Sequence, residues 1–415
     1  MKIKFTLIIS AVLFSICINN SYSQDTAKIM GYNLLNYSTG EARNVYFKKT
    51  LSNSSPDILA VCEIISEAAM NDMLVNVLNA VSPGVYNAGT FLDGPDTDNA
   101  IFYKTSKFTY VSNTPIHTSL RDINMFTLIH NMSRDTIRIF MCHLKASQGT
   151  DEELQRLQEV NAVRAVTNSF PAGTEFMILG DFNIYRSTEA CYIRMLEVEA
   201  LNDGEFIDPY SLPGTWNQFQ YAQYHSQSTR VRSFGGGATG GMDDRFDFIL
   251  NSDAMTQEGR IKFIPNSLKP FGNDGNHYND SINQRPNTAV PDSIADALAY
   301  SSDHLPVYGL YKFDVHPNSI SNISEVNPEG FSLYQNYPNP FNPNTIIKYK
   351  LGRPNFVSLK IYNSKGNEVA SLVNSRQTTG EYKIEFDASK YPSGVYYYKL
   401  TANNYSETKS MVLVK

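Results

Sequence analysis

The chain has 415 residues, of which 42% are hydrophobic and 18% charged. This balance excludes a disordered chain and suits about two or three globular domains of ~150 residues each. Residues 25–327 hold 22 Lys/Arg and 35 Asp/Glu, a net of −13, whereas residues 328–415 hold 11 and 6, a net of +5. Such an acidic region binds nucleic acid poorly through charge alone, but it is a good host for divalent cations.

Residues 1–24 have the pattern of a secretory signal peptide. Two lysines precede an apolar run from Phe5 to Ile18, and small polar residues follow it. We therefore expect cleavage near Ser23 or Gln24. The apolar run is shorter than the ~20 residues that a membrane anchor needs, and no later segment looks apolar enough to cross a bilayer.

Residues 25–315 alternate between strand-like and helix-like segments. Helical periodicity covers residues 63–81, and a clear amphipathic helix is expected over 151–170. Strands are expected at residues 28–35, 57–64, 99–104, 137–144, 175–183, 245–252 and 306–313. This alternation predicts an α/β domain of mixed sheets with helices outside.

The character of the sequence changes near residue 316. Residues 316–330 are expected to form a short polar linker. Short strands separated by turn residues are then predicted at 345–351, 357–363, 368–373, 382–388, 394–402 and 408–415. Their spacing predicts a small β-sandwich over residues 331–415.

Three cysteines remain after the predicted leader: Cys62, Cys142 and Cys191. An odd, small number argues against a disulfide framework. Cys62 and Cys142 each precede a polar residue at a strand end, so we expect both to point to a buried face. Free buried thiols are the favoured interpretation, and a Cys62–Cys142 bridge is the alternative.

Polar side chains collect at the ends of the predicted strands. Each one taken singly has an ordinary explanation, such as capping a turn. In α/β sheets, however, strand ends converge on one rim, where ligands bind. The residues with this shared placement are Asn33, Glu63, His143, Asp181, Asn183, Asp247, Asp303 and His304.

These segments resemble the endonuclease/exonuclease/phosphatase superfamily, which includes pancreatic-type deoxyribonucleases, abasic-site endonucleases, sphingomyelinases and inositol-polyphosphate phosphatases. The matching stretches occur in the family's order over residues 27–314: "YNLLNY", "DILAVCEI", "CHLKAS", "ILGDFN", "RFDFIL" and "SDHLPV". "GDFN" followed by "SDH" about 120 residues later is the most specific part. The resemblance implies a four-layer α/β sandwich and divalent-metal-dependent hydrolysis of phosphoesters.

The resemblance also implies a metal site and an oriented histidine. Glu63 would be the principal metal ligand with Asn33 beside it, and Asp303 would be an outer or second-metal ligand. Mg²⁺ is the expected cofactor, with Mn²⁺ and Ca²⁺ as alternatives. His304 would act as general base or phosphate stabiliser, oriented by Asp247.

The remaining positions would act on the substrate. Asp181 and Asn183 would hold the attacking water and a phosphate oxygen, and His143 would hydrogen-bond the scissile phosphate. Arg121 matches a family position at which an arginine contacts phosphate, although its surroundings diverge. The number of metals stays open, as does the choice between Asp181 and His304 as the proton acceptor.

A long insert over residues 209–245 departs from the best-known members of the superfamily. Its glycines at 235, 237 and 240 match a dinucleotide fingerprint by spacing, but they follow a polar loop and precede a strand. The fingerprint needs a strand before and a helix after, so we predict a turned loop at the rim. Residues 225–232 are equally compatible with substrate contact and with an ordinary surface insertion.

The tail carries a second resemblance. "LYQNYPNPFNPNTIIKYKL", "VSLKIYNSKGNEVASLV" and "YPSGVYYYKL" are similar to the C-terminal sorting domain of type IX secretion in Bacteroidetes-like bacteria, over residues 331–415. That family addresses cargo across the outer membrane, which implies the type IX machinery as a partner. The alternative is an immunoglobulin-like accessory or glycan-binding module.

Together these features predict an Mg²⁺-dependent phosphodiesterase that is secreted or held on the outer cell surface. The favoured function is an extracellular nuclease, with nucleic acid as substrate. The alternatives are a phospholipid or sphingolipid phosphodiesterase, a phosphomonoesterase, or a non-catalytic surface module on the same fold.

Overall fold

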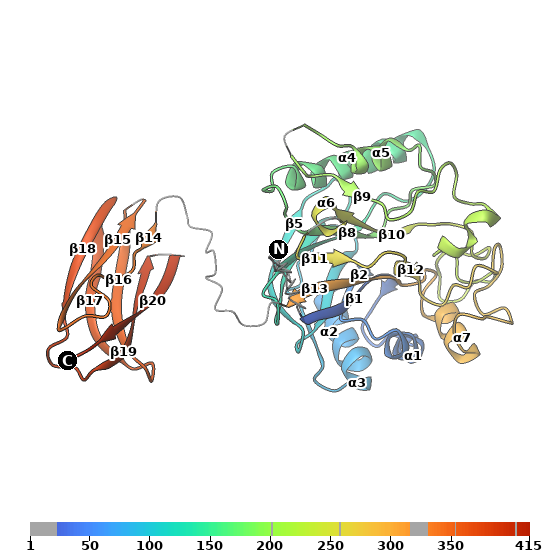
Figure 1. The fold of residues 1–415 in the computed structure, drawn as a ribbon. Coiled ribbons are helices and arrows are strands. Elements are labelled where there is room, and N and C mark those ends of the chain that lie inside the picture. Colours follow the sequence, from blue (N-terminus) through green and yellow to red (C-terminus); the bar gives the residue numbers. More distant parts are fainter. Residues whose placement is uncertain (1–22, 201, 257–258, 316–330, 353, 403–404) are drawn as a thin grey trace, which may run out of the picture. The chain divides into compact units, whose positions relative to one another are not determined.

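The computed structural model describes residues 23–200, 202–256, 259–315, 331–352, 354–402 and 405–415. The chain divides into two units, one ending at residue 317 and one beginning at residue 318 (Figure 1). The predicted linker and almost all of the predicted signal peptide lie outside the described residues. Ser23 and Gln24, where cleavage is expected, begin the first strand.

The first sheet of the N-terminal unit is mixed and has seven strands. Its central strands are buried on both faces, which explains their almost continuous apolar sequence. In spatial order the strands are β11 (Ile261–Phe263), β13 (Val307–Val315), β1 (Ser23–Tyr37), β2 (Ile58–Ile64), β4 (Asp98–Lys104) and β3 (Tyr86–Ala88), with β12 (Lys269–Pro270) paired to β13.

The second sheet is also mixed and has six strands. β7 and β8 run parallel, and β10 runs antiparallel to β8. The spatial order is β5 (Phe108–Ile116), β6 (Ile123–His130), β7 (Thr136–His143), β8 (Phe176–Asp181), β10 (Asp247–Ser252) and β9 (Phe206–Ile207).

Helices cover the outer faces of both sheets (Figure 1). The second sheet packs under α4 (Thr150–Thr167) and α5 (Ala190–Leu196). The first packs under α1 (Asn44–Ser54), α2 (Glu67–Asp72) and the π-helical η1 (Met73–Leu78), and the short α3 (Asn79–Val81) follows η1. The shorter elements are η2 (Phe219–Tyr224), α6 (Asp253–Thr256) and α7 (Asp292–Ser301).

A third apolar cluster fills the space between the two sheets. It joins Ile29 and Ile58 of the first sheet to Ile139, Leu179 and Ile249 of the second. The order of layers is therefore helix, sheet, sheet, helix, which confirms the predicted four-layer α/β sandwich. The helical pattern predicted from residue 63 begins only at Glu67, where the Ser66 side chain caps the helix by accepting from Ala69 N.

The C-terminal unit is a small β-sandwich, as predicted. A three-stranded sheet contains β14 (Ser332–Leu333), β15 (Asn344–Leu351) and β18 (Gly380–Asp387). A four-stranded sheet contains β17 (Glu368–Gln377), β16 (Asn355–Asn363), β19 (Gly394–Ala402) and β20 (Tyr405–Leu413). Burial alternates strictly along β15, as expected for a strand with one face on a core.

The cysteines are buried and free. Cys62 lies in the core between the two sheets, whereas Cys142 lies in the core beneath α4 and α5. The alternative of a Cys62–Cys142 bridge is therefore wrong. Burial raises the pKa of Cys62 and Cys142 well above the usual range, which makes these thiols poor nucleophiles. Among the helices in the described part of the chain, none has the length and apolar character to cross a bilayer.

Candidate active site

Strand register brings three of the predicted residues together. His143 lies opposite Asp181 across the parallel pair β7 and β8, and Asp247 lies opposite Asp181 across β8 and β10. The glycine that precedes Asp181 is required by this close pairing, because a Cβ on Gly180 would lie 2.0 Å from the carbonyl oxygen of Cys142.

The first sheet supplies its residues from irregular strand ends. The pairing of β1 with β2 loses its register beyond Asn33, and that of β2 with β4 shifts between Val61 and Ile64. Glu63 has a φ of 56° and Asn183 a φ of 51°, both in the left-handed region. Glycine and asparagine residues adopt this region most readily, and a glutamate there is unusual. Such backbone strain clusters at functional sites, where it aims a side chain at a ligand.

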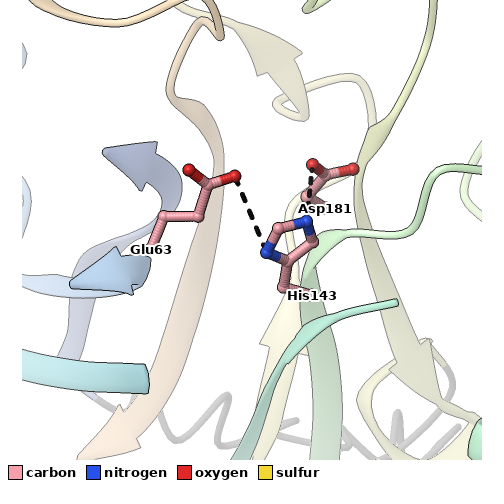
Figure 2. Close-up of side chains that lie close together, drawn as sticks. All are labelled: Glu63, His143 and Asp181. Atoms are coloured by element: carbon pink, nitrogen blue, oxygen red, sulfur yellow. Dashed lines mark ion pairs between the residues drawn. The ribbon is translucent and has the colours of Figure 1, made fainter. Parts of the chain in front are cut away.

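Glu63, His143 and Asp181 form a group that could hold a metal ion (Figure 2). Glu63 Oε1 lies 3.7 Å from His143 Nδ1, and His143 Nε2 lies 3.6 Å from Asp181 Oδ2. Burial, assisted by the positive charge of Arg121, lowers the pKa of His143 well below its usual value, so the imidazole is neutral. Its buried Nδ1 has no hydrogen-bond partner among the described residues. Two carboxylates and a neutral imidazole are a donor set that fits a divalent metal.

Asn33 lies beside this group as a hydrogen-bond donor. Its Nδ2 donates to Glu63 Oε1 at 2.8 Å and to Asp181 Oδ2 at 3.1 Å, while its Oδ1 accepts from Leu35 N at 2.9 Å. Asp303 is held differently, because its Oδ2 accepts from Ala238 N at 2.6 Å. The structure thus brings Glu63 into the metal-binding group, and metal ligation by Asn33 and Asp303 stays a prediction.

Asp247, His304 and Asp181 form a continuous polar chain. Asp247 Oδ2 lies 2.8 Å from His304 Nδ1, and His304 Nε2 lies 3.5 Å from Asp181 Oδ2. Burial alone would lower the pKa of His304, but the carboxylates of Asp247 and Asp181 raise it well above its usual value. Burial raises the pKa of Asp181 to about 7 against the opposing charge of His304, and Asp247 and Glu63 reinforce the rise. A carboxyl group that titrates near neutral pH is suited to proton transfer.

Asn183 and Arg121 flank these residues. The backbone N–H of Asn183 donates to Asp181 Oδ1 at 3.1 Å, and its side chain donates to the carbonyl of Leu144 at 3.3 Å. Arg121 Nη1 lies 3.3 Å from the carbonyl of His143, and its Nε donates to Asp96 at 2.8 Å. Arg121 therefore stands next to the strand end that carries His143, with its side chain tied to Asp96.

The insert contributes a residue that the sequence motifs did not identify. Gln227 Nε2 lies 2.9 Å from His304 Nε2, and the hydroxyl of Ser226 accepts from Asp247 N at 3.0 Å. Ser226 and Gln227 thus contact the Asp247–His304 pair, and substrate contact by residues 225–232 stays a prediction. No spacing rule singles out Gln227, because its position depends on how the insert folds back.

Comparisons with known proteins separate the two units. Residues 335–415 match the family described as "Secretion system C-terminal sorting domain". No curated protein sequence matches the chain.

Several solved structures are similar to the chain. A humanized D. rerio TDP2 carrying 14 mutations is 16% identical with a TM-score of 0.45, over 69% of this chain and 98% of that chain. An endonuclease/exonuclease/phosphatase family protein from Bacteroides thetaiotaomicron is 17% identical with a TM-score of 0.43, over 71% and 98%. A mannosyl-6-phosphatase from the same species is 15% identical with a TM-score of 0.41, over 69% and 99%.

Residues 335–415 thus match a secretion system sorting domain, and one of the similar solved structures is described as an endonuclease/exonuclease/phosphatase family protein.

Proposed function

We propose that the protein is an exported, divalent-metal-dependent phosphoester hydrolase whose substrate is extracellular nucleic acid. The observation that carries the proposal is the position of Asp181. Its Oδ2 faces His143 Nε2 at 3.6 Å on one side and His304 Nε2 at 3.5 Å on the other. One carboxylate thus joins a candidate metal site to a candidate acid–base pair.

Glu63, His143 and Asp181 are the residues that would hold the metal, and Mg²⁺ is the ion we expect. When bound, a divalent ion neutralises the charge of a phosphate group and lowers the pKa of a coordinated water. Asn33 would support this site by fixing the two carboxylates that it hydrogen-bonds.

The polar chain would handle the proton. Asp247 accepts from His304 Nδ1 and so directs Nε2 at the site. Water attacks phosphorus and passes one proton to the protein, while the bond from phosphorus to the leaving oxygen breaks and the leaving alkoxide takes up a proton from the solvent. Against the effect of burial, the carboxylates of Asp247 and Asp181 raise the pKa of His304, so its imidazolium is suited to stabilising the phosphate charge. In this proposal Asp181, whose Oδ2 lies 3.5 Å from His304 Nε2, takes the proton of the water.

The sorting domain supports export by the type IX route. The signal peptide predicted over residues 1–24 would first direct the chain into the periplasm. The exported protein would be released from the cell or kept on its outer surface. Nucleic acid is the proposed substrate class because the residues gathered at the site are polar and would suit a phosphodiester.

A second candidate is the hydrolysis of small soluble phosphoesters. It is favoured by the net charge of −13 over residues 25–327, which repels a long polyanion. The sphingolipid alternative keeps the same chemistry with a different alcohol.

The test is an assay of residues 25–415, purified and supplied with Mg²⁺ or with EDTA. The substrates are supercoiled plasmid, total RNA, sphingomyelin and bis-p-nitrophenyl phosphate. EDTA-sensitive loss of plasmid or RNA supports the nuclease. Turnover of only the small ester or the lipid, with both polymers intact, contradicts it and favours the second candidate or the lipid alternative.

A further inference from the structure

We infer that a cavity formed by the glycine-rich loop of the insert is a subsite for the alcohol part of the substrate, and that it takes an uncharged ring bearing O–H or N–H donors. This inference rests on the proposed function, because it places the ring beside the reacting phosphate. The loop is residues 234–237, and it faces the segment 35–43, which contains the end of β1 and the turn after it.

The cavity has a volume of ≈ 400 Å³, within the range of small-molecule sites. One wall is Phe234 and the three glycines after it, and the other includes Leu35, Asn36, Glu41 and Arg43. Two of the glycines whose spacing matched a dinucleotide fingerprint, Gly235 and Gly237, therefore lie in this wall together with Gly236.

Both walls adjoin the candidate active site. The backbone N–H of Asn36 donates to Glu63 Oε2 at 2.9 Å. On the other wall, a Cβ on Gly237 would lie 2.6 Å from Asp303 Cγ, so the loop backbone touches that carboxylate. We therefore place one ester group of a phosphate held at Glu63 in this cavity.

The glycine wall is held by buried contacts. Arg230 is 4% exposed, and its Nη2 donates to the carbonyls of Phe234 and Gly236 at 2.8 and 2.9 Å. Its Nη1 donates to the carbonyls of Ala299 and Ser302. Because Arg230 ties the loop to the segment before His304, the wall is formed before any ligand binds.

The lining defines the kind of group that fits. Phe234 is 38% exposed and packs edge-on against Tyr46 and Tyr300, which leaves part of its ring free to contact a planar or saturated ring. Glu41 is ionised, since its hydrogen bond from Arg43 lowers its pKa, and it retains lone pairs for O–H or N–H donors.

A second phosphate would fit poorly. Arg43 is the cationic side chain of the lining, and its two terminal nitrogens are used on the carbonyls of Leu34, Leu35 and Ser301 and on Glu41. With this cation engaged and a carboxylate beside it, the cavity favours an uncharged group. A nucleoside and a hexose both supply such a ring.

The test uses residues 25–415 and three diesters that share p-nitrophenolate as leaving group. They are methyl p-nitrophenyl phosphate, thymidine 5′-(p-nitrophenyl phosphate) and glucose 6-(p-nitrophenyl phosphate). We expect the thymidine ester or the glucose ester to have a higher kcat/KM than the methyl ester. Phe234→Ala should raise KM for that ester about tenfold, as for the loss of one aromatic stacking contact, and should leave the methyl ester unchanged.

Glu41→Gln should also lower the kcat/KM of the ring-bearing ester relative to the methyl ester. The ester that loses activity, nucleoside or hexose, identifies the ring that the cavity binds. Phe219→Ala is the matched control, because Phe219 is an exposed aromatic of the same insert that does not line the cavity. Equal kcat/KM for all three esters, or equal losses on all three in Phe234→Ala, would overturn the subsite. A wild type that cleaves no ester with any divalent metal would overturn the proposed function itself.

Discussion

The two units of the chain bury different kinds of side chain. The N-terminal unit buries acidic residues and histidines at its strand ends, among them Asp181, Asp247 and His304 at 2–5% exposure. In the described part of the C-terminal unit, the buried polar residues are Asn336 and Thr345. All non-glycine residues with positive φ in the described chain also belong to the N-terminal unit, from Leu35 to Asn279.

Buried charges and strained backbone are costly, and a fold keeps them where they serve a function. The comparison therefore favours the N-terminal unit as the location of the proposed chemistry. The C-terminal unit has an apolar core and a net charge of +5 over residues 328–415, and residues 335–415 match the sorting-domain family. The following predictions test this division, from the largest expected effect to the smallest.

Removal of residues 331–415 should abolish export and leave the activity of the purified N-terminal unit unchanged. The reason is that no residue of the candidate site comes from the C-terminal unit. Secreted activity and intracellular activity would be compared in cells producing either chain. Normal secretion of the truncated chain would contradict the sorting role.

Asp181→Ala and His304→Ala should each lower kcat at least ~10²-fold without unfolding the protein, since both lie in the proposed proton-transfer chain. Steady-state rates on the true substrate and circular dichroism check this together. His117→Ala is the control, because this histidine side chain is 79% exposed and lies outside the site. Wild-type rates in either site variant would remove that residue from the mechanism.

Gly237→Ala should lower activity by about tenfold while the unit stays folded. The residue has a φ of 77°, and its new Cβ would press on Asp303. Gly236→Ala is the matched variant, because a Cβ there would meet no atom within 4 Å although φ is also positive. Equal rates in the two variants would show that the contact with Asp303 is unimportant.

Asp274→Asn should destabilise the N-terminal unit by about 1–2 kcal/mol at pH 7. Burial alone would raise the pKa of Asp274, but hydrogen bonds from Thr288 and Asn276 lower it to about 2. Because this lies below the unfolded value of ~3.9, the stabilisation is present above pH ~4 and is lost as the pH falls through about 2.

Urea unfolding followed by fluorescence measures this effect, because Trp216 is the single tryptophan and is buried in the N-terminal unit. Asp387→Asn, in the C-terminal unit, is the control and should not change the transition. If the difference in unfolding free energy between wild type and Asp274→Asn is as large at pH 2 as at pH 7, the lowered pKa of Asp274 is not its cause.

The sequence predicted those parts of the fold that depend on local pattern. Apolar runs that end in polar residues located β2, β7, β8 and β10, and short strand-like segments separated by turn residues located β15 to β20. The hairpin of β5 and β6 was not predicted, since its outer strand is polar and contains Pro115.

Features of the site that depend on tertiary contacts were also beyond the sequence. The grouping of Glu63 with His143 arises from two sheets facing each other, and the contact of Gln227 with His304 arises from the folded insert. Likewise, the amide orientation of Asn33 is decided by the N–H of Leu35. Spacing along the chain carries none of this information.

The most direct test of the central claim is a metal titration of phosphodiester hydrolysis in wild type and Glu63→Gln. The variant keeps the size of the side chain and removes one carboxylate of the proposed metal site. We expect EDTA to abolish wild-type activity, Mg²⁺ to restore it, and Glu63→Gln to need at least ~10-fold more metal or to stay inactive. Wild-type activity that survives EDTA, or identical metal dependence in the two proteins, would contradict the account.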